Sequence, residues 1–234
     1  FRLGAHTDLE YCERNIDDTY ITNTLSVENA VRISNELSIP LVFISTAGIF
    51  DGKKIFYDDW DLPNPLGHYA KSKYAAEKFI QHNCNKYLIC RAGWMMGGGP
   101  RKDKKFVNKI YKQIVKGNKE LFVVKDKLGT PTYTHDFVKN LFKILESGHL
   151  GLYNLVCEGN TSRLEVAKEI LITLNLESKI SIKAVNSDYF STKFFAPRPK
   201  SENLINYKLN LRSLNIMRDW RVCLREYLNN EFKI

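Results

Sequence analysis

The sequence predicts an α/β fold with a largely parallel sheet, and three observations point to it. Short apolar runs of strand length alternate along the chain with longer amphipathic stretches of helix length. The run at 39–46 is apolar at almost every position, which is typical of a strand that helices cover on both faces. Of the 234 residues, 44% are hydrophobic and 12% aromatic, so the chain can bury a core and is not a solvated coil.

The first half of the chain alternates helix and strand. We expect a helix over about 17–37, the buried strand at 39–46, and a second helix at 67–82. Residues Tyr87–Cys90 form the next apolar run and predict a second strand. The segment 101–119 predicts a helix, because apolar residues recur in it every four positions.

The second half continues this alternation. Ser162 and Glu165 form a capping box, which predicts the start of a helix that runs to about 175. The other elements expected here are strands at 120–125, 151–157 and 180–185, a helix at 135–147, and a closing helix at 213–230 that buries Trp220. No apolar run approaches the ~20 residues of a membrane helix, so no membrane partner is expected.

Basic residues outnumber acidic ones by 35 to 26, a formal net charge of +9 that indicates an anionic partner. Many of them lie between Arg101 and Lys119, on the predicted amphipathic helix. We expect most of these lysines to form a solvated face and one or two to bind phosphate. No nucleic-acid recognition motif accompanies the charge, so binding of DNA or RNA is the weaker hypothesis.

The five cysteines are odd in number and include no CxxC pair. This pattern argues against a disulfide framework and a zinc ribbon, and it predicts buried thiols in a reducing compartment. Residues Phe1–Leu3 lead into polar sequence and not into a signal peptide, so we expect a cytoplasmic protein. The five histidines lack metal-ligand spacing, and no metal site is predicted.

A dinucleotide-binding sheet usually opens with a Gly-rich turn after its first strand. This sequence has no such turn near its start, and Gly97–Gly99 comes too late and leads directly into Pro100. Two interpretations follow: the fold does not bind nucleotides, or the first βαβ unit is missing from this sequence.

Tyr69 and Lys73 are the strongest chemical signal. Four residues apart, they share one face of the helix predicted at 67–82. A phenol with a pKa of about 10 exchanges protons poorly at neutral pH, but a lysine cation beside it favours the phenolate and lowers that pKa. Such a pair can pass a proton to or from a carbonyl oxygen. Alone, the pattern also occurs by chance on many surface helices.

Ser45 and Thr46 end the buried strand, at the edge where parallel sheets bind ligands. Thr46 precedes Tyr69 by 23 residues, enough for a loop and a helix to fold back onto the strand end. We therefore expect Thr46 to hydrogen-bond the carbonyl oxygen that Tyr69 protonates.

The segments 45–52 and 61–73 resemble the extended short-chain dehydrogenase/reductases, and within them the dTDP-4-dehydrorhamnose reductase branch. Further stretches resemble that branch in its own order along nearly the whole chain. They are Ala5–Asp8, Asn23, Arg91–Trp94, Gly129–Tyr133 with Asp136, Arg198–Pro199, and Asp219–Arg221. Each match is modest, and their order and spacing make the resemblance strong.

The resemblance implies a Rossmann-like doubly wound parallel sheet with a small C-terminal substrate lobe. Residues 1–150 would form the NAD(P)-binding domain, with 93–125 contributing to the substrate side, and 151–234 would form most of the substrate lobe. Position 1 would fall about sixty residues into the family, past the Gly-rich βαβ unit. Without that unit, we expect a chain that starts at Phe1 to bind NAD(P)H negligibly.

The resemblance also assigns roles. The implied reaction is NADPH- or NADH-dependent reduction of a 4-keto-6-deoxy nucleotide sugar, a polysaccharide precursor. Tyr69 would donate the proton, Lys73 would lower its pKa and hold the nicotinamide ribose, and Thr46 would orient the ketone. Cofactor contacts would come from Ala5, His6, Thr7, Ser45, Tyr69 and Lys73, and substrate contacts from Thr46, Ala47, Trp94 and Arg198. A homodimer and a magnesium ion are compatible with the family, although no residue set in this sequence indicates the metal.

One departure from the branch matters. Ala47 stands where the reductases usually carry Asp, which puts one polar substrate contact in doubt. Ala47–Gly48 argues against the related dehydratases, which need an Asp-Glu pair there, but is compatible with a nucleotide-sugar 4-epimerase. Phe50–Gly52 and Gly129–Tyr133 favour a reductase. A non-catalytic, reductase-like regulatory subunit is the third alternative.

Overall fold

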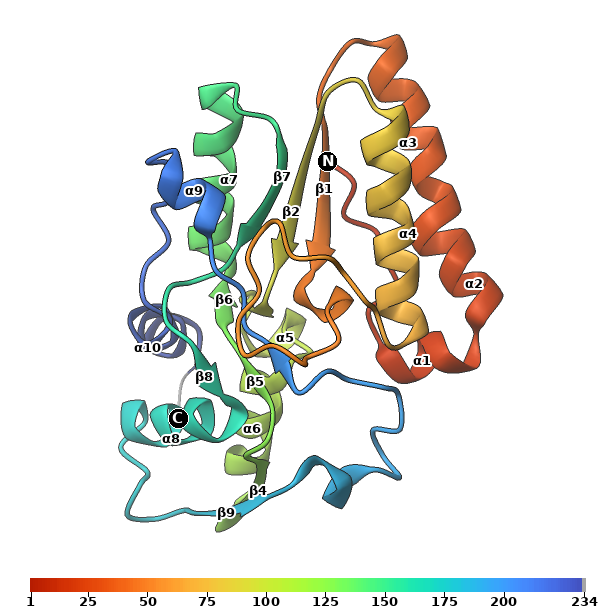
Figure 1. The fold of residues 1–234 in the computed structure, drawn as a ribbon. Helices are drawn as coiled ribbons and strands as arrows, with labels where there is room; N and C mark the ends of the chain where they lie inside the picture. The colour runs from red at the N-terminus through yellow and green to blue at the C-terminus, as the bar shows by residue number, and fades with distance from the viewer. Residues whose placement is uncertain (233–234) are drawn as a thin grey trace.

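A computed structural model describes residues 1–232 (Figure 1). Its central sheet consists of β1 (Leu41–Thr46), β2 (Tyr87–Ala92) and β7 (Gly151–Leu155), in the order β1-β2-β7 and all parallel. Arg2 adds a bridge on the free side of β1, where its backbone N–H donates to the Val42 carbonyl at 2.8 Å. The carboxyl ends of all three strands therefore lie at one edge of the sheet.

Helices cover both faces of this sheet (Figure 1). Because successive strand residues point to opposite faces, Phe43 packs with α3 (Ser26–Glu36) and α4 (His68–Asn83), while Val42 joins the cluster that includes α7 (Thr134–Ser147). A parallel sheet with helices on both faces is the doubly wound arrangement, so the predicted fold class is confirmed.

The helical segment that precedes β1 changes its winding midway. It contains α1 (Leu9–Arg14), α2 (Ile16–Tyr20) and α3, with one π-helical turn at Ile21–Leu25 between the last two. The prediction of a helix at 17–37 is confirmed apart from this turn. Asn23 sits in the turn and is 1% exposed, so the irregular winding coincides with an inward-facing polar side chain.

A second layer of short elements lies beyond the carboxyl ends of the central strands (Figure 1). Its strands pair across long stretches of sequence: β3 (Trp94–Met96) with β6 (Pro131–Tyr133), β4 (Glu120–Val124) with β9 (Ser181–Val185), and β5 (Leu128–Gly129) with both β8 (Thr161–Ser162) and β10 (Ser201–Glu202). The helices of this layer are α5 (Gly99–Lys102), α6 (Phe106–Val115), α8 (Arg163–Thr173) and α10 (Trp220–Glu231). The short α9 (Tyr207–Leu211) lies instead beside α7 and β7 (Figure 1). Both halves of the chain thus build this lobe together.

Two helix predictions need correction. The helix expected within 101–119 is split, because the Asp103 carboxylate accepts the Lys105 backbone N–H at 2.6 Å and ends α5. The closing helix begins at Trp220 and not at 213, because Ser213 adopts a left-handed φ of 55° and Asp219 caps α10. The cap predicted at Ser162 is confirmed: its hydroxyl accepts the Glu165 N–H at 3.1 Å. Trp220 and all five free cysteines are buried, as expected.

An ion pair inside the core joins α4 to β2. The Arg91 guanidinium contacts both oxygens of the Glu77 carboxylate, with a shortest distance of 2.8 Å, and the two side chains are 4% and 0% exposed. Arg91 also lies over the Phe50 ring at 5.4 Å. Two desolvated charges are tolerated here because each compensates the other.

We predict that Glu77→Ala destabilises the protein by about 3–5 kcal/mol, because it leaves the buried Arg91 charge without a partner. Chemical denaturation measures the change. Glu36→Ala is the matched control: it breaks an exposed ion pair with Arg32 at 3.2 Å and should cost less than about 1 kcal/mol. Equal losses in the two variants would contradict the argument.

Candidate functional site

The carboxyl end of β1 and the first turn of α4 meet at the candidate site. The Thr46 hydroxyl accepts the Gly48 backbone N–H at 3.1 Å and hydrogen-bonds the Tyr69 hydroxyl. Both side chains are half-buried, so they remain open to a ligand. The structure thus brings together two of the three residues that the sequence predicts to be catalytic.

Tyr69 is held in its protonated form. Burial and, to a lesser extent, the nearby Glu202 carboxylate raise the pKa of its phenol to about 12, although the hydrogen bond with Thr46 opposes both. This direction is opposite to the one expected from pairing with Lys73. The phenol is therefore a proton donor at neutral pH and a poor base.

Lys73 is a buried cation with little compensation. Its side chain is 4% exposed, and its Nζ lies 3.9 Å from the centre of the Phe43 ring. No carboxylate of residues 1–232 lies within ion-pair distance of it, because Glu77, one turn further along α4, is engaged by Arg91. Burial lowers the pKa of Lys73 to about 7, and the charge of Glu77 limits the fall. A ligand that offers Lys73 a hydrogen bond or a negative charge would relieve this cost.

The loop Ala5–Thr7 is fixed to α4 through Asn23. The Asn23 carboxamide accepts the His6 N–H at 2.8 Å and donates to the His6 carbonyl at 3.1 Å. It also donates to the Ser72 hydroxyl at 3.1 Å, and Ser72 in turn donates to the Tyr69 carbonyl at 2.8 Å. One buried amide therefore sets the loop against the helix that carries Tyr69 and Lys73.

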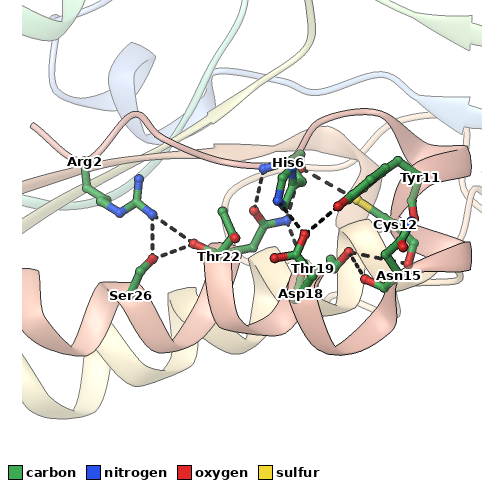
Figure 2. A network of polar contacts seen from close by, with 11 residues as sticks. Arg2, His6, Tyr11, Cys12, Asn15, Asp18, Thr19, Thr22 and Ser26 are labelled. Atoms are coloured by element: carbon green, nitrogen blue, oxygen red, sulfur yellow. Dashed lines mark hydrogen bonds and ion pairs between the residues drawn. The ribbon is translucent and has the colours of Figure 1, made fainter.

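The His6 side chain also helps to hold the loop Ala5–Thr7 in place (Figure 2). Its Nε2 lies 2.9 Å from the Asp18 carboxylate, which also accepts the Tyr11 hydroxyl at 2.7 Å. At the start of the chain, the Arg2 guanidinium donates to the Thr22 carbonyl at 2.9 Å (Figure 2). The His6 ring is thus directed toward α2, and the loop presents backbone and the exposed Thr7 to the site.

A second group of side chains, centred on Trp94, forms another wall of the candidate site. Its indole N–H donates to the Glu202 carboxylate at 2.7 Å, and the Arg163 guanidinium lies 3.5 Å from the indole ring centre. Gly129 makes room for the ring, because a Cβ there would lie 2.3 Å from an indole carbon. Trp94, Arg163 and Glu202 are all half-buried, so the cluster faces the open side of the site.

The site contains two charged residues that sequence reasoning missed. Arg163 lies between Ser162 and Glu165 of the predicted capping box, and neither it nor Glu202 belongs to a motif of its own. The one signal for Glu202 was its place four residues after Arg198, in a stretch that resembles the substrate side of the reductases. A charged residue in a two-residue strand is too weak a pattern to predict a site.

Basic side chains gather beside the Trp94 cluster. Lys105 donates to the Thr7 hydroxyl at 3.3 Å and so closes the site against the N-terminal loop. Burial, helped by neighbouring cations, lowers the pKa of Lys105, Lys109 and Arg163, that of Arg163 to about 10. A hollow of about 280 Å³ opens here, lined by Thr7, Met95, Met96, Gly97, Lys102, Asp103, Lys104, Lys105 and Thr134. Because burial disfavours the charged form of these side chains, a bound anion would stabilise that form, so the cluster suits an anionic ligand.

Two residues expected to contact substrate are placed differently. Arg198 forms an ion pair with Glu10 at 2.7 Å, so its charge is already matched within the protein. Ala47 is 2% exposed and packs with Ile49, Phe50 and other apolar side chains. Its methyl group lies in the core and not on the open face, so any polar contact at that wall must come from another residue.

The chain as a whole is similar to known proteins. A family model described as the RmlD substrate binding domain matches residues 1–232. The spore coat polysaccharide biosynthesis protein SpsK of Bacillus subtilis is 31% identical over 96% of this chain and 76% of its own length. The dTDP-4-dehydrorhamnose reductase of Escherichia coli is 28% identical over 98% of this chain and 78% of its own.

A solved structure is similar over the same range. The dTDP-4-dehydrorhamnose reductase of Bacillus anthracis, in complex with NADP, gives a TM-score of 0.89 at 30% identity and covers 97% of this chain and 78% of that one. Within residues 1–232, none of the helices combines the length and apolar character that crossing a membrane requires.

Lys73 makes stability depend on pH. Between pH 7 and about 10.5 the unfolded chain binds a proton that the folded chain does not, so this group makes stability rise with pH; below pH 7 its cost is greatest and constant. We predict that Lys73→Met stabilises the protein at pH 6, and that the gain shrinks by ~1–2 kcal/mol by pH 9. Urea denaturation at both pH values measures this. Lys71→Met, at an exposed position of the same helix, should show no such dependence, and parallel pH curves for the wild type and Lys73→Met would refute the assignment.

Proposed function

This chain belongs to the RmlD substrate binding domain family, and from that premise we propose that it reduces a 4-keto-6-deoxy nucleotide sugar with NADPH or NADH. The observation that carries the proposal is a protonated tyrosine, Tyr69, hydrogen-bonded to Thr46 at the carboxyl end of a parallel strand. Relatives named as dTDP-4-dehydrorhamnose reductases support it. The similarity to SpsK leaves the nucleotide and the sugar to be tested.

The residues present fit the nicotinamide nucleoside end of such a cofactor. The Ser45 hydroxyl, at the end of β1, is buried and has no hydrogen-bond partner in the described part of the chain. The Lys73 ammonium is buried without an ion pair, and the loop Ala5–Thr7 is fixed beside α4. Among residues 1–232, the Gly-rich turn at a helix start is Gly97–Gly99, which precedes the four-residue helix α5 in the second lobe. It does not follow the first strand of the sheet, where a turn that holds the cofactor's diphosphate is expected. When bound, the nicotinamide supplies the hydride.

The chain's own residues then handle the carbonyl oxygen. Thr46 positions that oxygen by a hydrogen bond, and Tyr69 gives it a proton as negative charge develops there. A pKa of about 12 keeps the phenol protonated until then, and the Thr46 hydroxyl stabilises the phenolate that remains. Lys73, one turn along α4, supplies a positive charge on the same helix face.

The basic cluster of Arg163, Lys105 and Lys109 is the proposed binding site for the substrate's diphosphate. Arg163 has no carboxylate within ion-pair distance among residues 1–232, and its planar group lies 3.5 Å from the centre of the Trp94 ring and 4.8 Å from that of the Phe106 ring. Lys105 and Lys109 add charge on the same side. A guanidinium fixed by stacking can donate two parallel hydrogen bonds to a phosphate.

The 4-epimerase alternative fits the site less well. An epimerase must take a proton from a hydroxyl as readily as it returns one, and the raised pKa of Tyr69 leaves little phenolate at neutral pH to act as that base. The regulatory-subunit alternative predicts no turnover at all. NADPH or NADH consumption with a panel of dTDP- and UDP-linked 4-keto sugars would identify a reductase and its substrate. Epimerised product formed without net cofactor consumption would identify an epimerase, and a protein that binds the cofactor but gives neither result would fit the regulatory subunit.

We expect Tyr69→Phe to lower kcat by at least ~10²-fold, because it removes the proton donor and keeps the ring. Cofactor oxidation with the accepted substrate measures the loss. Tyr74→Phe is the control, since Tyr74 lies on the same helix and packs against apolar core residues. Near-full turnover in Tyr69→Phe would exclude Tyr69 as the acid.

We expect Arg163→Met to raise KM about tenfold with kcat little changed, because it removes a cation that contacts a non-reacting part of the substrate. Arg221→Met is the matched control, since Arg221 lies over the Trp220 ring at 4.5 Å in another part of the protein. Steady-state kinetics measures both constants. A fall in kcat with unchanged KM would argue against the diphosphate assignment.

A further inference from the structure

A carboxylate occupies the wall that Ala47 leaves apolar. Glu202 ends β10, opposite Gly129 in the register with β5. Its Oε1 lies 3.4 Å from the position that a Cβ on Gly48 would take. Glu202 therefore stands beside the turn that directly follows Thr46, although it comes from the far end of the chain.

The two carboxylate oxygens of Glu202 have different surroundings. Oε2 accepts the Trp94 indole N–H at 2.7 Å, which fixes the orientation of the group. No donor among the described residues contacts Oε1, and the side chain is half-buried. One oxygen is thus held by the protein, and the other is left to accept a hydrogen bond from a ligand.

Glu202 also lies within electrostatic reach of the reacting groups. Its charge raises the pKa of Tyr69 and that of Arg163, so it acts on both the proposed acid and the proposed phosphate ligand. No lysine or arginine of residues 1–232 lies within 4.0 Å of it, so its charge is not neutralised by an ion pair. A carboxylate only accepts hydrogen bonds, so it favours donors and repels anions.

We propose that Glu202 is a specificity-determining residue: its Oε1 accepts a hydrogen bond from the sugar hydroxyl on the ring carbon next to the carbonyl held by Thr46 and Tyr69. This inference rests on the proposed reduction of a nucleotide sugar. It supplies the polar contact that Ala47 cannot make, from another element of the fold. A sugar without that hydroxyl, or with a carboxylate in its place, should be a poor substrate.

The test compares two 4-keto nucleotide sugars, one with the neighbouring hydroxyl and one deoxy at that carbon. We expect wild-type protein to prefer the hydroxylated sugar by about tenfold or more in kcat/KM, because a site built to bond a hydroxyl rejects the analogue that lacks it. In Glu202→Gln the ratio should fall toward one, since the amide oxygen still accepts from Trp94 while the NH2 can only donate to the hydroxyl, in a weaker neutral hydrogen bond. Glu177→Gln, at an exposed position, should keep the wild-type ratio.

A second measurement separates recognition from a purely structural role in holding Trp94. Removing the negative charge should move the alkaline limb of the kcat profile of Glu202→Gln to lower pH, because that charge raises the pKa of Tyr69. A wild-type preference below twofold would overturn the proposal before any variant is made. A preference that is the same in the wild type and in Glu202→Gln would also overturn it. If the protein binds both sugars but reduces neither, the proposed reduction fails, and the ratio of their affinities by calorimetry still tests Glu202.

Discussion

The buried ion pair between Arg91 and Glu77 is the contact on which the site depends. It joins the middle strand of the central sheet to α4, the helix that carries Tyr69 and Lys73. A displaced α4 would lose the hydrogen bond between Thr46 and Tyr69, because those groups come from different elements. The same carboxylate limits the fall in the pKa of Lys73. One buried pair thus holds the helix that carries the candidate site and also limits the shift in the pKa of Lys73.

Burial acts on the two candidate proton-transfer groups in opposite directions. It raises the pKa of Tyr69 to about 12 and lowers that of Lys73 to about 7. Desolvation disfavours whichever form is charged, so a phenol keeps its proton and an ammonium tends to lose one. At neutral pH, Tyr69, which hydrogen-bonds Thr46, is therefore protonated. The interactions that would reverse this order must come from ligands, since the described residues offer Lys73 no ion pair.

Local sequence patterns predicted the part of the site that depends on local geometry. The four-residue spacing of Tyr69 and Lys73, and the place of Thr46 at a strand end, follow from helix and strand periods. Glu202 and Arg163 lay outside prediction because they reach Trp94 through strand pairings between distant segments. Likewise, the burial of Ala47 is a packing outcome that no short motif encodes.

The strand pairings between distant segments in the second lobe have a consequence for folding during synthesis. Trp94 meets Glu202 across 108 residues of sequence, and β4 pairs with β9 in the same non-local manner. Such contacts carry a large loop-closure entropy and form late in folding. On the ribosome, β1, α4 and β2 can assemble while the wall around Trp94 still lacks its partners. Tyr69 therefore meets Thr46 before Trp94 meets Glu202, and a chain released early would hold the first pair in place without the second.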